Sequence, residues 1–243
     1  MAHRSRLRIL TWNIHHGVGT DGRYDLDRIA REIGKVEADI VCLQEVDDRF
    51  GARTNGEPQP ARLAAALGMD DAVGHALPSR LGTDGGYGNV VLATSTIEAV
   101  DTIELDAEPD DAGEPRVLVS VELDHQGTAV TVWCTHLDHA SPANRSAQVC
   151  DLVRRMGTDG LPTVLAGDLN ATPSANELAP LRDRLQDPFD DPVDPATFPA
   201  LAPERRIDYL LVDPCQVRVD SITVPRTRAS DHRPVMADFV LIH

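Results

Sequence analysis

The sequence has few aromatic residues and no surplus of positive charge. Aromatic side chains make up 4% of its 243 residues, whereas a protein that stacks the bases of single-stranded nucleic acid usually carries more rings. Its 39 acidic residues outnumber its 23 basic ones, and the formal net charge is −16. Such a chain repels polyphosphate backbones unless cations or a local basic patch intervene. The composition therefore disfavours a general DNA-binding protein.

The acidic surplus itself has two interpretations. Either the extra carboxylates only keep the surface soluble, or some of them bind a metal ion. The rest of the composition is that of an ordinary globular protein, because 42% of the residues are hydrophobic and 26% are charged. A chain of this length is able to bury one large core.

Cysteines and long apolar segments are also scarce. The four cysteines (Cys42, Cys134, Cys150 and Cys215) lie far apart and form no CxxC pair. Three of them sit within apolar runs, so we expect reduced, buried thiols. No segment is apolar enough to span a membrane, and the first residues hold no apolar stretch of signal-peptide length. We therefore expect a cytoplasmic protein without a membrane span, and the sequence leaves its oligomeric state open.

Short apolar runs rich in Val, Ile and Leu predict strands along the whole chain. They cover residues 7–12, 39–43, 89–93, 117–123, 129–135, 163–166, 207–212, 217–224 and 235–241. Helical periodicity predicts helices over 26–36, 61–67 and 144–156, and a weaker one over 175–185. Asp25 is the expected N-cap of the first helix, and Ser141-Pro142 opens the third.

The order of these elements favours a mixed α/β protein. Adjacent strands such as 117–123 and 129–135 are typical of antiparallel hairpins, and no stretch looks like a domain boundary. We expect one domain over residues 1–243, with two sheets packed together and helices outside. Loops rich in Gly, Pro and Asp either line a binding site or are acidic surface loops. They cover residues 50–60, 79–88, 107–115 and 186–206.

Polar residues follow several of the predicted strands, at the point where each buried run ends. They are Asn13, Glu45, His136, Asp168 with Asn170, Asp208, and Asp231 with His232. Taken singly, each is more often a turn residue, a solvated carboxylate or a structural histidine. Their coincidence at six strand ends carries more weight, because the strand ends of a sheet sandwich are able to share one rim. The pattern therefore predicts a single polar site.

The residue types in this set indicate a hard-cation site. Carboxylate and amide oxygens without cysteine suit Mg²⁺ or Mn²⁺ better than structural zinc. Such a cation neutralises phosphate oxygens and the charge on a leaving group. A histidine backed by an aspartate is able to act as a general base or as an electrophile. The set predicts metal-dependent hydrolysis of a phosphate ester.

Read in order, the motifs WNI, LQEV, GN, EPR, THL, GDLNATP, RIDY and SDHRPV resemble those of the endonuclease/exonuclease/phosphatase superfamily. This DNase I-like superfamily includes nucleases, sphingomyelinases and inositol polyphosphate phosphatases. The resemblance runs from about residue 7 to residue 239. It implies a four-layered α/β sandwich, in which two mixed β-sheets pack face to face with helices on the outside.

The resemblance also implies a metal site and a site for the attacking water. By that resemblance, Asn13 and Glu45 hold Mg²⁺ or Mn²⁺, Glu45 most directly, and Asp231 helps from the opposite side. Asp168 would orient or deprotonate the water, with Asn170 beside it in contact with phosphate.

The other matched residues would act on the phosphate group. His232, supported by Asp208, would hydrogen-bond a phosphate oxygen or act as a base, and His136 would stabilise the charged transition state. Arg116 and Asn89 would bind phosphate or support the rim. A guanidinium matches phosphate well, although a surface salt bridge is an alternative role for Arg116.

Residues beside the motifs carry weaker expectations. Trp12 and Tyr209 are expected to pack rather than to stack on substrate. His15 and His16 lie on the loop after the first strand and either line the mouth of the site or point away, since adjacent loop residues rarely both point inward.

The sequence leaves more than one substrate class open. A small or lipid-derived phosphodiester is favoured by the acidic charge and the short chain, while a nuclease is the alternative. A third alternative is a non-catalytic binding module that keeps the fold. Such a module would be expected to have lost some of the polar site residues, and this sequence retains all of them.

Overall fold

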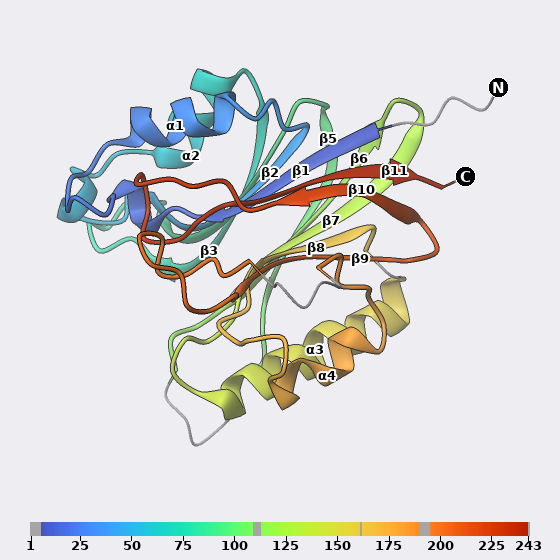
Figure 1. Cartoon of the computed structure of the whole chain (residues 1–243). Helices are drawn as coiled ribbons and strands as arrows, with labels where there is room; N and C mark the ends of the chain where they lie inside the picture. Colours follow the sequence, from blue (N-terminus) through green and yellow to red (C-terminus); the bar gives the residue numbers. More distant parts are fainter. Residues whose placement is uncertain (1–5, 109–112, 161, 190–194, 243) are drawn as a thin grey trace.

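The strands form two mixed sheets that pack face to face (Figure 1), as expected. The computed structural model describes residues 6–108, 113–160, 162–189 and 195–242. The six-stranded sheet has the order β10-β11-β1-β2-β4-β3, and β1 and β2 run parallel. Its strands are β1 (Arg6–Asn13), β2 (Ile40–Asp48), β3 (Asp70–Pro78), β4 (Gly86–Ala93), β10 (Val217–Thr223) and β11 (Val235–Leu241).

The second sheet has the order β5-β6-β7-β8-β9, with β7 and β8 parallel. Its strands are β5 (Ile97–Glu104), β6 (Val117–His125), β7 (Thr128–His136), β8 (Val164–Asp168) and β9 (Asp208–Val212). Helices cover the outer faces of the two sheets (Figure 1) and complete the four layers. They are α1 (Leu26–Gly34) and α2 (Gln59–Leu67) on one side, and α3 (Pro142–Asp159) and α4 (Ala179–Arg182) on the other.

Three apolar cores hold the layers together. The largest lies between the sheets, where side chains of β1 and β11 such as Ile9 and Phe239 meet Val121 and Val132 of the other sheet. A second core joins α1 and α2 to the six-stranded sheet, and a third joins α3 and α4 to the five-stranded sheet. Because the central strands, such as β2, β4, β7 and β8, are buried on two faces, their sequences are short continuous apolar runs rather than strict alternations.

The helices begin where the sequence predicts them. The side chain of Asp25 accepts a hydrogen bond from the backbone N–H of Arg28 at the start of α1. Ser141 accepts one from the N–H of Asn144 at the start of α3, with Pro142 in the first turn. Each cap satisfies one backbone donor that has no partner inside the helix.

Two strands, β3 and β5, were not expected from the sequence. Both lie at the edge of their sheets, and β5 exposes most of its side chains, so it lacks the apolar run that marks the buried strands. The weaker helix over 175–185 is shorter than expected, since a 3-10 turn (Asn176–Leu178) precedes the four residues of α4. The hairpin of β6 and β7 is confirmed, with antiparallel pairs from 118↔135 to 125↔128.

The cysteines are free thiols, but not all of them are buried. Cys42 and Cys134 lie in the core, whereas Cys150 and Cys215 are exposed. The expectation of burial is wrong for Cys150, because its apolar run forms a helix and this position faces solvent. No helix in the described part of the chain is long and apolar enough to cross a membrane.

Candidate active site

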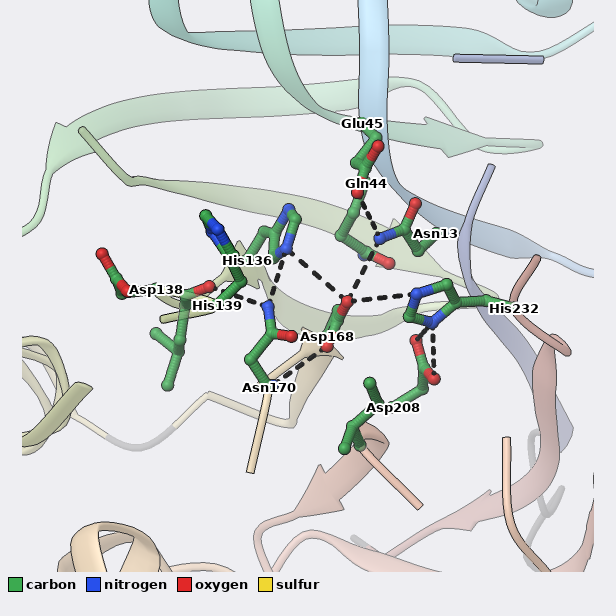
Figure 2. A network of polar contacts seen from close by, with 12 residues as sticks. Asn13, Gln44, Glu45, His136, Asp138, His139, Asp168, Asn170, Asp208 and His232 are labelled. Atoms are coloured by element: carbon green, nitrogen blue, oxygen red, sulfur yellow. Dashed lines mark hydrogen bonds and ion pairs between the residues drawn. The ribbon is translucent and has the colours of Figure 1, made fainter. Parts of the chain in front are cut away.

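Strand register brings the predicted polar residues together. His136 ends β7, Asp168 ends the parallel strand β8, and Asp208 begins the antiparallel strand β9, so that the three are neighbours in register. On the facing sheet, β1 ends at Asn13, and Glu45 lies on β2 next to the partner of that residue. Neighbouring parallel strands end on the same side of a sheet. The strand ends of the two sheets carry the polar cluster that Figure 2 shows.

Asp168 stands at the centre of the cluster and is almost completely buried. Its Oδ2 accepts a hydrogen bond from Nδ2 of Asn13 at 3.1 Å and lies 3.5 Å from Nε2 of His136 and 3.7 Å from Nε2 of His232. Its Oδ1 accepts the backbone N–H of Asn170 at 2.9 Å. Figure 2 shows the carboxylate between the two imidazole rings. These hydrogen bonds, one to each oxygen, fix the orientation of the Asp168 carboxylate.

The charges of this cluster are set by burial and by the neighbouring groups. Burial and the nearby negative charge of Asp208 raise the pKa of Asp168 to about 7. Burial opposes the charged form of His232, but the carboxylates of Asp208 and Asp168 outweigh it and raise the pKa of His232 to about 10. At neutral pH, His232 is therefore an imidazolium ion, held by Asp208 through Nδ1 at 3.0 Å.

His136 has the opposite character. Burial and the positive charge of Arg116 lower its pKa well below the usual value, so the ring is neutral. The amide Nδ2 of Asn170 donates to the carbonyl oxygen of Leu137 and lies 3.0 Å from Nε2 of His136. With an amide donor at Nε2, the ring proton resides on Nδ1. His136 is thus a neutral hydrogen-bond donor beside the charged His232.

Arg116 is buried at the wall of the site, with 3% of its side chain exposed. One terminal nitrogen lies 3.2 Å from Oε1 of Glu114 and the other 3.2 Å from Nδ1 of His139. Arg116 therefore does pair with a carboxylate, as the alternative supposed, but its guanidinium is buried rather than at the surface. Asn89 is also buried, but its amide donates to the carbonyl of Val117 at 2.8 Å and joins the two sheets. This contact agrees with support of the rim.

A cavity of about 390 Å³ opens above these groups. It is lined by Glu45, Tyr87, Glu114, Arg116, His136, His139, Asp168, Asn170, Phe198, Arg205, Asp231 and His232. Sequence reasoning misses Phe198, yet its ring centre lies 4.7 Å from that of His232, and the guanidinium of Arg205 lies over the same ring, 5.1 Å from its centre. Only the loop over 186–206 pointed to them, because loops of this length often line sites.

Backbone and core contacts fix the motif that carries His232. The hydroxyl of Ser230 donates to the carbonyl of Asn13 at 2.7 Å, and the indole N–H of Trp12 donates to the carbonyl of His232 at 3.0 Å. Trp12 is completely buried, and Tyr209 is buried with its hydroxyl bonded to Ala171. Both residues pack, as expected, and do not stack on a substrate.

Two groups of side chains in the described residues have the spacing of a metal site. The ligand atoms of Asp168, Asp208 and His232 lie within 4.8 Å of one another in the buried cluster. The same spacing holds for His15, His16 and Glu45 at the partly exposed mouth. Carboxylate oxygens in both groups suit a divalent cation.

The predicted metal residues Asn13, Glu45 and Asp231 surround the same part of the site. Nδ2 of Asn13 donates to Oε1 of Glu45 at 2.9 Å, while its Oδ1 accepts the backbone N–H of His15 at 3.0 Å. Both carboxylates line the cavity. The carboxylates of Glu45 and Asp231 and the amide oxygen of Asn13 are therefore the candidate ligands here, and Asn13 also orients the carboxylate of Glu45.

Some known proteins resemble this chain in sequence and others in structure. YbhP of Escherichia coli strain K12 is 29% identical over 250 residues, which is 96% of each chain. An endonuclease/exonuclease/phosphatase structure from Beutenbergia cavernae has a TM-score of 0.77 at 27% identity, covering 98% of this chain and 72% of that one. A mannosyl-6-phosphatase of Bacteroides thetaiotaomicron has a TM-score of 0.78 at 21% identity, covering 96% and 99%.

The family assignment rests on most of the chain. Residues 10–232 match the model of the Endonuclease/Exonuclease/phosphatase family, and this range holds every site residue described above. The chain therefore belongs to that family and carries its phosphoesterase fold around the buried cluster of Asp168, Asp208 and His232.

Proposed function

We propose that this protein hydrolyses a phosphodiester by in-line attack of water, with Mg²⁺ or Mn²⁺ as cofactor. The observation that carries the proposal is the arrangement of Asp168 between a neutral and a charged histidine, in a cavity lined by carboxylates and the buried Arg116. The set holds a proton acceptor, a proton donor and an anion-binding group within reach of one phosphate. Phosphoester hydrolysis is accelerated mostly by such electrostatic positioning.

Asp168 is the proposed acceptor of the proton from water. Its pKa of about 7 places it close to the operating pH, where a general base is most effective. Asn13 and Asn170 hold the two carboxylate oxygens, so the base needs little reorganisation. As the water oxygen bonds to phosphorus, its proton passes to the carboxylate.

His232 is the proposed donor to the leaving oxygen or to a phosphate oxygen. It is charged at neutral pH and is therefore suited to give a proton rather than to take one. When the phosphorus–oxygen bond breaks, the imidazolium ring protonates the alkoxide that leaves. Asp208 fixes the ring through Nδ1 and leaves Nε2 facing the cavity. His136 and Arg116 stabilise the charge on the other phosphate oxygens.

The carboxylates of Glu45 and Asp231 would hold the cation, and Asn13 orients Glu45. A bound Mg²⁺ or Mn²⁺ supplies positive charge that offsets the negative charge of the phosphate. The oxygen donors at this place fit such an ion.

A small or lipid-derived ester is the proposed substrate class. The cavity holds about 390 Å³, and a net charge of −16 disfavours a long polyanion. One structural neighbour is a mannosyl-6-phosphatase, which acts on a small phosphate ester. A nuclease is the competing candidate, and salt separates the two. A polyanion binder loses affinity steeply between low and physiological salt, and a small-ester enzyme does not.

The first test is hydrolysis of an aryl phosphodiester and of the matching monoester, with and without Mg²⁺ or Mn²⁺. We expect metal-dependent turnover of the diester, lowered on the order of 100-fold or more in Asp168→Asn. Asp101→Asn, an exposed aspartate on β5, is the matched control and should behave as wild type. Faster turnover of the monoester would replace the diester assignment. Absence of turnover together with absence of metal binding would favour a binding module.

A further inference from the structure

His15 and His16 both reach the mouth of the active site. They form a 3-10 turn (His15–Gly17) directly after β1, and their ligand nitrogens lie within 4.8 Å of each other and of a carboxylate oxygen of Glu45 on β2. Their ring centres are 4.5 Å apart in an edge-on arrangement. Both rings thus lie beside Glu45, which lines the cavity, although neither histidine is among the residues that line it.

An unusual backbone brings the two rings to the same side. His15, His16 and Glu45 have φ angles of 45°, 43° and 57°, which lie in the left-handed region that side chains normally avoid. Two contacts hold the turn in place. The side chain of Asn13 accepts the N–H of His15 at 3.0 Å, and Gln59 donates to the carbonyl of His16 at 2.8 Å. Such conformations persist when the surroundings impose them, often at functional sites.

The nitrogen atoms are arranged as they are in metal-binding histidines. Nδ1 of His15 lies 3.3 Å from the carbonyl oxygen of Val18. A carbonyl only accepts, so Nδ1 carries the proton and Nε2 keeps its lone pair, the arrangement that orients a ligating ring. Nδ1 of His16 is buried and has no hydrogen-bond partner among the described residues. A buried polar atom without a partner is costly, and a ligand would remove this cost.

The local charge also favours a cation. The group contains the carboxylate of Glu45, and Oδ1 of Asp231 lies 3.8 Å from Nδ1 of His15. The guanidinium of Arg53 makes two hydrogen bonds to the buried carboxylate of Asp47, at 2.6 and 2.9 Å. That carboxylate offsets part of the positive charge that Arg53 places near His16. Two imidazole rings and the carboxylate of Glu45 thus surround one point, and Asp231 lies on the Nδ1 side of His15.

We propose that His15, His16 and Glu45 form a binding site for a first-row transition ion at the mouth of the active site, and that this site binds Zn²⁺, Co²⁺ or Mn²⁺ more tightly than Mg²⁺. Two histidines and one carboxylate form a set typical of catalytic zinc and non-haem iron sites, whereas Mg²⁺ takes oxygen ligands. The inference rests on the proposed function in one respect, because Glu45 is the carboxylate assigned there to the cation.

The test measures metal binding without substrate. The metal-free full-length chain is titrated with Zn²⁺ and with Mg²⁺ by calorimetry, and with Co²⁺ by its visible absorption. His15→Ala and His16→Ala should each weaken Zn²⁺ binding about tenfold or more. Mutation of a residue that only hydrogen-bonds a metal ligand already lowers metal affinity by about tenfold, and loss of the ligand itself should cost at least as much. Mg²⁺ binding should change little. His75→Ala, an exposed histidine on β3, is the control and should match wild type.

A second measurement keeps the test decisive if a variant does not fold. Addition of Zn²⁺ to the wild-type chain should shift the ring ¹⁵N resonances of His15 and His16 together. Zn²⁺ affinity that is unchanged in a folded His15→Ala/His16→Ala chain, or rings that do not respond, would overturn the assignment. Ester hydrolysis that depends on Asp168 alongside unchanged Zn²⁺ binding would do so as well.

The opposite combination separates this inference from the proposed function. Loss of Zn²⁺ binding in both variants, with no hydrolysis of either aryl ester by wild type, would uphold the ligand set and refute the phosphoesterase proposal.

Discussion

Replacement of Asp208 by asparagine tests the central pair of the site. Asp208→Asn keeps the shape of the side chain but removes the charge that faces His232 at 3.0 Å. The pKa of His232 rises from 6.5 to about 10 in the folded chain, which corresponds to about 5 kcal/mol of preference for the charged ring at 1.36 kcal/mol per pKa unit. Loss of one partner from a buried pair costs about 3–5 kcal/mol.

The loss of stability should depend on pH in a definite direction. A raised pKa contributes stability that is complete below the unfolded value of 6.5 and disappears as the pH rises through about 10. The difference between wild type and Asp208→Asn should therefore be largest near pH 6 and shrink toward pH 10. Urea unfolding of the metal-free chains at several pH values measures it.

Activity should fall as well, because the ring loses its charge and its orientation. We expect a decrease in kcat on the order of 100-fold with little change in KM. Asp213→Asn is the control, since Asp213 is buried just beyond the far end of β9 and contacts no site residue among its hydrogen bonds. A loss of stability that is the same at pH 6 and pH 10, or kcat within about threefold of wild type, would refute the reasoning.

Three further predictions concern other parts of the molecule. Arg116→Ala should raise KM or lower kcat about tenfold or more in steady-state assays, because a buried guanidinium is lost from the wall, and unchanged kinetics would exclude phosphate contact. Asp238→Asn should destabilise the chain by about 1–3 kcal/mol in urea, since Arg8 donates to this carboxylate at 2.7 Å and lowers its pKa. This contribution should shrink as the pH falls through the lowered pKa, so a difference that grows toward acid pH would contradict it. Gly167→Ala should lower both the yield of folded protein and the activity, because a Cβ would lie 2.0 Å from the carbonyl oxygen of Thr135 at a φ of 155°. A folded and fully active variant would show that the backbone of β8 is able to shift and accept the methyl group.

The sequence alone was sufficient for the buried part of the fold. Strands such as β7 and β8 are apolar on both faces, and the runs that encode them depend only on neighbouring residues. Helix starts at Asp25 and Ser141 are likewise local, because a cap bonds to a backbone group three residues ahead. The edge strands β3 and β5 escaped prediction because pairing with a distant strand, rather than burial of both faces, makes them strands.

The sequence predicts which residues form the polar site, but not their distances, contacts or pKa values. A polar residue at the end of a buried apolar run indicates the end of a strand. The sequence therefore predicts Asp168 and Asp208 as members of the site. The pKa of about 7 at Asp168 could not follow from it, since burial and the charge of Asp208 act through space. The ring of Phe198 packs against that of His232, which lies far along the chain, and no local pattern encodes that contact.

The amino-acid sequence by itself thus determined the family, the layers and the identity of the chemical groups, because periodicity and motif order are local properties of the chain. Only the tertiary structure decided which oxygens of Asn13 and Glu45 remain free, which histidine is charged, and that His15 and His16 share one side of the mouth. Those properties depend on distances between residues on different strands, and on burial, neither of which is contained in any short segment.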